Sequence, residues 1–421
     1  MGVKRWIGLL LLGVTLLGLG LAYLLIDLYR TVPLPPVAGV VTLQFLPRLG
    51  RAALLGFLGL VAMLVAIAQI NRTLLAPFVR PGQNVVEAVS EHRRRGRGPK
   101  IVALGGGTGL SILLRGLKHH TSNLTAIVTV ADDGGSSGRL RRSLGVLPPG
   151  DFRNCLAALA DDEALTTQLF QYRFGGDKEL GGHSFGNLFI TAMSEVSGSF
   201  ERALLESSKV LAIRGQVLPS ALRDVTLVGE LVDDAQQVSR VAGESQITLT
   251  PGAIRRVYLE PEDAPAYPGA IRAILDADMI VLGPGSLYTS LLPNLLVRDL
   301  AEAIRAGRAQ KVYVCNTATQ PGETEGYTVL DHVTAIERHT WPGLFPLVLA
   351  NSSQTGTLLP HLEWVRLGSP VNGARRIVTA DLADAAYPWR HDSEKLANAL
   401  INLLTADDAE EVLTPRSMSS A

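Results

Sequence analysis

The stretch IVALGGGTGLS at residues 101–111 decides the fold, because an apolar, strand-like run breaks into a glycine-rich turn. A second turn of this kind, ADDGGSSG at 131–138, follows the apolar run 124–130, and a third, GPGS at 283–286, follows the run 279–282. The carboxyl ends of parallel strands meet at one edge of a sheet, where α/β proteins bind nucleotides and other phosphorylated ligands. The three turns therefore predict a ligand site built from bare backbone at that edge.

Strand-like apolar runs alternate with runs of helical pattern across residues 100–404. This alternation predicts an α/β domain with a mainly parallel sheet and helices on both faces. The expected strands are 101–104, 124–130, 226–231, 256–259, 279–282, 311–315 and 347–350. The expected helices are 110–117, 151–160, 187–196, 200–210, 269–276, 298–306, 328–338 and 393–404. The small, polar and acidic tail 405–421 is expected to be flexible.

Two uncharged apolar stretches, about 6–26 and 52–70, precede this domain. About 20 such residues span a bilayer as a helix, so residues 1–75 predict a two-helix transmembrane hairpin. The alternative for the first stretch is a cleaved signal peptide, but its apolar part is long and no small-x-small cleavage site follows. Basic residues outside both spans place both ends in the cytoplasm. We therefore expect a multi-pass protein of the inner (cytoplasmic) membrane with a cytoplasmic soluble domain, joined by a basic linker at 76–99.

The overall charge is balanced, with 39 Lys and Arg against 39 Asp and Glu, and no basic-aromatic stripe indicates a nucleic-acid partner. The basic run 92–100 either contacts anionic lipid headgroups or only flanks the second span. Two isolated cysteines form neither a disulfide framework nor a zinc motif.

The first glycine-rich turn lets a ligand approach the backbone, and the following helix would direct its free N–H groups at a phosphate. It is not a Walker A motif, because no Gly-Lys-Ser/Thr follows, and it is not a dinucleotide fingerprint, because Leu110 stands at the third glycine position. A tight turn without a ligand is the alternative. The candidate ligand-binding residues here are Gly105, Gly106, Gly107, Thr108, Gly109 and Ser111.

In the second turn, Asp132 and Asp133 could hold Mg²⁺ through oxygen ligands or bind the hydroxyls of a sugar. Successive strand residues point to opposite sides, so only one of the two acids is expected to face the site. The alternative is a surface turn with solvated acids. The other candidates in this turn are Gly134, Gly135, Ser136, Ser137 and Arg139.

Polar clusters elsewhere supply further candidates. Asp151 is either a ligand residue or a helix N-cap. His183 either donates to phosphate and acts in acid–base catalysis or has a structural role, and Tyr288 either stacks on a base or packs in the core. The catalytic candidates are Asp132, Asp133 and His183. The remaining ligand candidates are Arg153, Asn154, Asn187, Gly283, Gly285, Ser286 and Asn316.

Together these motifs resemble the gluconeogenesis factor family, which shares a superfamily with the 2-phospho-L-lactate transferases of deazaflavin cofactor synthesis. The resemblance runs from about residue 100 to about 404, and the long forms ADDGGSSG and GPGSLYTS favour the gluconeogenesis factor branch. The motifs that carry it are GGGTGLS (105–111), ADDGGSSGRLR (131–141), PPGDFRN (148–154), GHSFGN (182–187), GES (243–245), GPGSLYTSLLPN (283–294) and NTATQPGETEGYT (316–328).

The resemblance implies a Rossmann-like domain at residues 100–404 that binds a nucleotide-linked ligand at these strand ends. In the family this ligand is UDP-N-acetylglucosamine, and the role concerns cell shape and envelope growth on gluconeogenic carbon. Trp364 stands where the family has a tyrosine associated with the UDP-sugar. We expect a membrane-tethered regulatory protein without enzymatic activity. The alternative is a transferase that moves a phospholactyl group from a GDP-linked donor with Mg²⁺. The expected partners are a UDP-sugar or another nucleotide-linked molecule, the lipid bilayer, envelope-synthesis proteins and a second copy of the chain in a homodimer.

Overall fold

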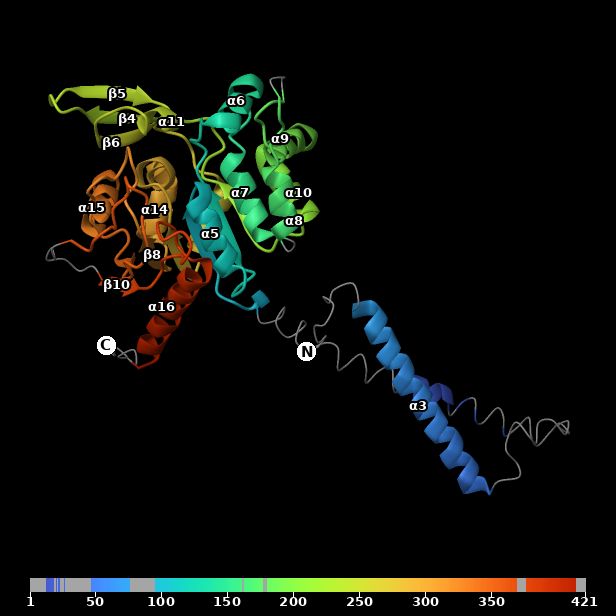
Figure 1. Ribbon diagram of the computed structural model, residues 1–421. Coiled ribbons are helices and arrows are strands. Elements are labelled where there is room, and N and C mark those ends of the chain that lie inside the picture. The colour runs from blue at the N-terminus through green and yellow to red at the C-terminus, as the bar shows by residue number, and fades with distance from the viewer. Residues whose placement is uncertain are drawn as a thin grey trace, which may run out of the picture. The chain divides into compact units, whose positions relative to one another are not determined.

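The computed structural model describes residues 13–18, 20, 22, 26, 47–75, 95–160, 163–176, 180–368 and 376–413 (Figure 1). The chain divides into two compact units, Met1–Val89 and Ser90–Ala421, each of which is considered by itself.

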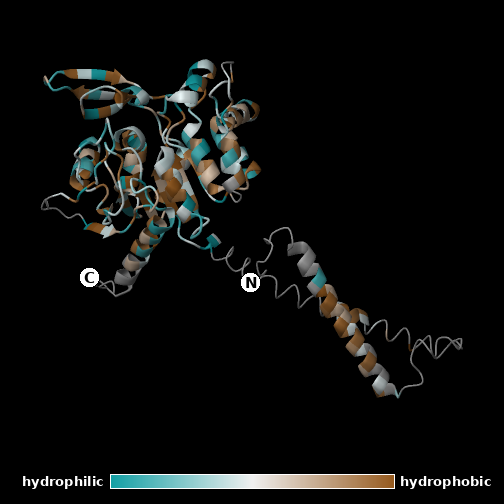
Figure 2. Ribbon diagram, viewed as in Figure 1, coloured by the Kyte–Doolittle hydropathy of each residue, from teal (hydrophilic) through white to brown (hydrophobic). Residues whose placement is uncertain are grey.

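The long element of the first unit is helix α3 (Arg48–Leu75). The middle of α3 is apolar, and its side chains, such as Phe57 and Leu64, are exposed (Figure 2). Arg51 precedes the apolar run and Gln69 follows it.

Among the described residues, no helix is both long and apolar enough to cross a membrane. The predicted multi-pass location in the inner membrane is therefore wrong, and the predicted transmembrane hairpin has no support. The first predicted span, about 6–26, and the linker 76–99 lie mostly outside the described residues.

Seven parallel strands form the large sheet of the second unit, in the order β10-β9-β8-β7-β1-β2-β3. The strands are β1 (Ile101–Gly105), β2 (Leu124–Val128), β3 (Gln216–Pro219), β7 (Met279–Leu282), β8 (Gln310–Val314), β9 (Leu347–Asn351) and β10 (Arg376–Ala380). In the register of the sheet, Ile101 of β1 pairs with Leu124 on one side and with Met279 on the other. All five residues of β1 are buried, which is why this strand is apolar throughout rather than alternating. The predicted α/β fold with a mainly parallel sheet is confirmed.

Helices connect and cover these strands. From α5 to α10 they are α5 (Gly107–Leu117), α6 (Gly135–Leu144), α7 (Gly150–Leu159), α8 (Glu163–Gln171), α9 (Phe185–Ser197) and α10 (Phe200–Val210). The later ones are α12 (Pro268–Leu275), the π-helix η2 (Leu287–Leu291), α13 (Leu292–Leu296), α14 (Arg298–Ala306), α15 (Val329–His339) and α16 (Ser393–Leu413). Right-handed crossovers lead from β1 through α5 to β2 and from β7 through α14 to β8, in opposite directions along the sheet, so α5 and α14 cover opposite faces. Helix α16 continues beyond Thr405, where we expected the flexible tail to begin.

Two of the predicted strands lie outside the large sheet. They are β4 (Thr226–Val232) and β6 (Ala253–Glu260), which pair antiparallel with each other, and β5 (Val238–Ala242) pairs with β4 (Figure 1). One face of β6 is exposed, unlike the central strands β1 and β7 of the parallel sheet. The short helix α11 (Glu244–Ile247) leads from this small sheet towards α6 (Figure 1).

Candidate functional site

The glycine-rich turns that follow β1 and β7 are in direct contact at the carboxyl edge of the large sheet. A Cβ at Gly109 would lie 2.4 Å from the carbonyl oxygen of Pro284, and a Cβ at Gly106 would lie 3.4 Å from Cβ of Ser290. The chain leaves β1 towards β2 and leaves β7 in the opposite direction, towards β8. The contact therefore marks the topological switch point of the sheet, where open α/β sheets bind their ligands.

Helices α5 and α6 both begin at this edge. Their N-cap residues are Gly106 and Gly134, which have no side chain with which to cap the helix. The first residues of the two helices are also glycines with positive φ, Gly107 at 61° and Gly135 at 46°. A Cβ at Gly135 would meet no atom within 4 Å, so the start of α6 is open. Because the first N–H groups of a helix lack intrahelical partners and carry the positive end of its dipole, this arrangement suits a phosphate.

Three carboxyl groups lie together beside these helix starts. Burial, and then the charge of Asp132, raises the pKa of Asp151 to about 7. Burial, and then the charges of Asp132 and Asp151, raises the pKa of Glu244 to about 8. Burial also raises the pKa of Asp132, although the N–H of Gly134 donates to its Oδ1 at 2.9 Å. Such a group of acids retains a proton near neutral pH and can accept hydrogen bonds from the hydroxyls of a ligand.

The Glu244→Gln substitution is expected to make the protein more resistant to alkaline pH. In the unfolded chain this carboxyl ionises near 4.5, whereas in the folded protein it keeps its proton up to about pH 8. Glu244 thus favours the folded state fully below pH 4.5, and this contribution is lost as the pH rises towards 8. Glutamine imitates the protonated carboxyl and never ionises, so the Tm of the variant should exceed that of the wild-type protein increasingly from pH 5 to pH 8.

Thermal unfolding followed by circular dichroism measures this difference, and Glu262→Gln at an exposed position is the matched control. A constant difference in Tm between Glu244→Gln and the wild-type protein over this pH range would contradict the prediction.

Asp133 fixes a distant turn to the loop that follows β2. Its Oδ1 accepts a hydrogen bond from the backbone N–H of Ser245 at 2.9 Å. A Cβ at Gly243, whose φ is 104°, would lie 2.4 Å from Oδ2 of Asp133, so only glycine permits this close approach. The contact brings Glu244 to the other acids. Asp132 and Asp133 therefore have different partners.

A buried hydrogen-bond network connects α6, α7 and α9 behind the edge. Ser136 Oγ is bonded to Nδ1 of His183 at 2.9 Å and accepts from Nδ2 of Asn187 at 3.1 Å. Arg153 donates through one nitrogen to Ser184 Oγ at 2.7 Å and to Asn187 Oδ1 at 3.1 Å. Burial lowers the pKa of His183, which favours a neutral ring. Three sequence-predicted residues, Arg153, His183 and Asn187, thus support one another.

Other predicted residues hold the loops in place or lie away from the open part of the edge. Asn316 and Gly285 exchange two hydrogen bonds, from the glycine N–H at 3.2 Å and from the amide nitrogen at 2.9 Å. Tyr288 is buried, with its hydroxyl bonded to that of Tyr327 at 2.9 Å, which supports the core-packing alternative. Arg139 is exposed and donates to a backbone carbonyl at 2.9 Å.

The remaining predicted residues make local contacts. Ser111 Oγ donates to the carbonyl of Thr108 at 2.7 Å, and Ser137 Oγ accepts from the N–H of Gly150 at 3.1 Å. Asn154 Oδ1 accepts from Arg153 and from Gln171, each at 3.0 Å. Gly105 and Gly283 are buried, and Ser286 is half-buried before η2.

Sequence reasoning did not select three polar residues that the fold brings to this edge. One is Glu244, which lies with Asp132 and Asp151 beside the helix starts. Glu323 is buried and accepts from the N–H of Tyr288 at 3.0 Å and from Thr289 Oγ1 at 2.7 Å, while burial raises its pKa to about 7. Asn294 donates to the carbonyl of Gly105 at 3.1 Å, so it holds the first glycine turn. All three stand in quoted motifs, but spacing alone gave no signal that these segments return to β1.

In the part of the chain that the structure describes, no group of three or more His, Cys, Asp or Glu side chains is arranged to hold a metal ion. The assignment of Asp132 and Asp133 as Mg²⁺ ligands stays a prediction.

Comparisons with known proteins agree with this geometry. The family model for 2-phospho-L-lactate transferase CofD matches residues 101–407. A relative from Nostoc sp. is 47% identical over 426 residues and covers 95% of this chain and 90% of that protein. The gluconeogenesis factor of Bacillus subtilis is 46% identical over 318 residues, covering 73% of this chain and 99% of that protein. The crystal structure of a UPF0052 family protein from Bacillus halodurans has 42% sequence identity and a TM-score of 0.66, with 72% of this chain and 99% of that chain covered.

Proposed function

This chain belongs to the 2-phospho-L-lactate transferase CofD family and to its gluconeogenesis factors, and from this premise we propose that it binds UDP-N-acetylglucosamine at the carboxyl edge of the large sheet. In this proposal it is a regulatory protein that responds to the supply of an envelope precursor, and through this it acts on cell shape and envelope growth on gluconeogenic carbon.

The observation that carries the proposal is the pair of glycine-capped helix starts at the switch point. A nucleotide-sugar presents a diphosphate, and α6 offers the N–H groups of its open start at Gly135, while the N–H of Gly107 at the start of α5 is bonded to Asp151. The open space at Gly135 leaves room for a phosphate to approach the backbone.

The carboxyl groups fit the sugar part of such a ligand. Asp132, Asp151 and Glu244 can accept hydrogen bonds from the ribose or the sugar hydroxyls, in keeping with their crowding beside the helix starts. The backbone of Trp364 forms a β-bridge with Ala318, two residues beyond Asn316, and we propose that its indole stacks on the base of the ligand.

The charged and polar groups at this edge favour ligand binding over transfer of a group from the ligand. A transferase must stabilise the negative charge that develops as a diphosphate-linked donor breaks. The carboxyl groups beside the helix starts offer no positive charge for this purpose. Arg153 is committed to Ser184 and Asn187, and the ring of His183 tends to be neutral.

We predict that the purified full-length protein binds UDP-N-acetylglucosamine reversibly without consuming it. Asp133→Asn should weaken binding by at most about threefold, or roughly 0.7 kcal/mol, because an amide oxygen can still accept from the N–H of Ser245. Titration calorimetry with UDP-sugars, GDP, GTP and NAD, with and without Mg²⁺, measures affinity and selectivity.

The protein is then incubated with UDP-N-acetylglucosamine or a GDP-linked phospholactyl donor, Mg²⁺ and lactate-like or deazaflavin acceptors, and released UMP, UDP and GMP are quantified by chromatography.

Steady release over many turnovers that disappears in Asp133→Asn would establish the transferase instead. Failure of every UDP-sugar to bind would remove the proposed ligand.

A further inference from the structure

Two cavities of similar volume open at the amino edge of the large sheet, opposite the site described above. One lies at the start of β8, β9 and β10 and measures about 590 Å³, and the other lies at the start of β1, β2 and β3 and measures about 600 Å³. Volumes of this size are typical of small-molecule sites. The two cavities differ in charge.

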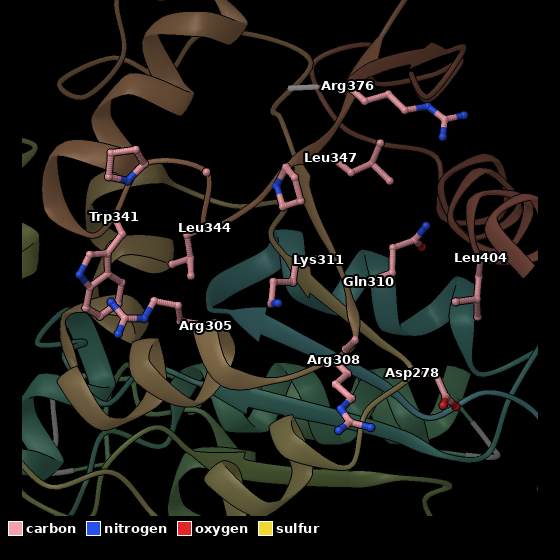
Figure 3. Close-up of a pocket in the computed structure, with 14 residues that line it drawn as sticks. Asp278, Arg305, Arg308, Gln310, Lys311, Trp341, Leu344, Leu347, Arg376 and Leu404 are labelled. Carbon is pink, nitrogen blue, oxygen red and sulfur yellow. The ribbon is translucent and has the colours of Figure 1, made fainter. Parts of the chain in front are cut away.

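The first, which we call the basic cavity, is lined by four cationic side chains, Arg305, Arg308, Lys311 and Arg376, and by one carboxylate, Asp278 (Figure 3). Asp278 accepts a hydrogen bond from the backbone N–H of Lys100 at 2.8 Å. One oxygen of this carboxylate is therefore already bonded to a residue that does not line the basic cavity.

Three of these cations have no acidic partner. In the described part of the chain, none of Arg305, Arg308 and Lys311 forms an ion pair. Lys311 is half-buried and donates to the carbonyl of Gly307 at 2.8 Å, and burial lowers its pKa. An ammonium group loses hydration when it is buried, and a negatively charged ligand would offset that loss.

Arg305 is held in place by an aromatic ring. Its guanidinium lies over the indole of Trp341, 4.7 Å from the ring centroid, and Figure 3 shows the two side chains together at one side of the cavity. This cation–π contact restricts the guanidinium without neutralising its charge. Leu344 and Leu347 add apolar wall next to it.

The second cavity provides the comparison. Its cations are Lys100 and Arg272, and Lys100 forms an ion pair of 2.7 Å with Asp276 on the same wall. The charge of this cavity is therefore largely compensated by the protein itself, whereas that of the basic cavity is not.

We propose that the basic cavity is a second ligand site, which binds a small metabolite that carries two or three negative charges on carboxylate or phosphate groups. Such a ligand would bind at the start of β8, next to Lys311, while the candidate nucleotide site lies beyond the end of the same strand, at Asn316.

Citrate and inorganic pyrophosphate serve as probes, titrated separately into the full-length protein by calorimetry at physiological salt. We expect one-to-one saturable binding of at least one probe, and the tighter of the two identifies carboxylate or phosphate as the recognised group. Arg308→Ala and Lys311→Ala should each weaken this binding at least about fivefold, through loss of a charge-assisted contact. Arg272→Ala in the compensated cavity is the matched control and should leave it unchanged.

Pyrophosphate could also occupy the diphosphate site, so the titrations are repeated in Gly135→Val, which should bind the probes as the wild-type protein does. Binding should change the intrinsic fluorescence, and Trp341→Phe should abolish that change. The proposal is overturned by the absence of saturable binding up to about 10 mM, by equal weakening in Arg272→Ala, or by affinity that is insensitive to both Arg308→Ala and Lys311→Ala.

Discussion

The Gly135→Val variant is expected to bind UDP-N-acetylglucosamine at least about thirtyfold more weakly than the wild-type protein, a loss of roughly 2 kcal/mol. Gly135 is the first residue of α6, and a side chain there enters the open space in which we place a phosphate. Valine also separates the phosphate from the N–H groups of the helix start, and this separation removes the favourable interaction with the helix dipole. Titration calorimetry well below the Tm of the variant measures the affinity.

Strain must be distinguished from the loss of the ligand site, because valine at a φ of 46° is itself unfavourable. Gly145, the C-cap of the same helix, has a φ of 67°, and a Cβ there would also meet nothing within 4 Å. Gly145→Val therefore imposes similar strain at the end of α6 that lies away from the diphosphate. It should lower the Tm about as much as Gly135→Val and leave the affinity intact. Equal loss of affinity in both variants, or full affinity in Gly135→Val, would show that the start of α6 does not bind the ligand.

The centre of the sheet was predictable because its strands are buried on both faces. The predicted strand 279–282 coincides with β7, and 101–104 falls one residue short of β1. An apolar run that ends in glycine gives a clear signal when helices cover both sides of a strand. The edge strands β3 and β10 gave no such signal, since their exposed positions carry residues such as Gln216 and Arg376.

The site was predictable only in the loops that directly follow these strands. The glycines at 105–109 and 134–135 stand at the switch point because chain connectivity alone puts them there. Glu244 was out of reach, because Asp133 and Ser245, which form the hydrogen bond that positions it, are 112 residues apart in the sequence. Such a contact depends on tertiary packing, which local pattern does not encode.

Arg153 is the residue on which the buried network behind this site depends most. Its guanidinium bonds to Ser184 and Asn187, and Asn187 in turn bonds to Ser136 at the start of α6. A Cβ at Gly186 would lie 2.6 Å from Cγ of Arg153, so the start of α9 also packs directly on the aliphatic stem of this arginine. The charge and the stem therefore make separate contributions to the position of α9.

The Arg153→Met variant is expected to lower the free energy of unfolding by about 2 kcal/mol, because it keeps the stem and removes the guanidinium. Asn187 Oδ1 then loses its donor in a buried position, at roughly 1–3 kcal/mol for an unsatisfied group. Ser184 Oγ keeps only the longer bond from the N–H of Asn187, at 3.3 Å. Two effects reduce this loss of stability. The buried arginine has itself given up hydration, and its Nε has no hydrogen-bond partner among the described residues, so removing the guanidinium also removes these costs. We expect the loss of the three hydrogen bonds of the guanidinium, each of 3.1 Å or less, to outweigh this relief. Urea unfolding measures the change, and Arg142→Met on the exposed face of α6 should change it by less than about 0.5 kcal/mol. Equal stability of Arg153→Met and the wild-type protein would mean that the guanidinium contributes no net stability and that packing of its stem on Gly186 alone positions α9.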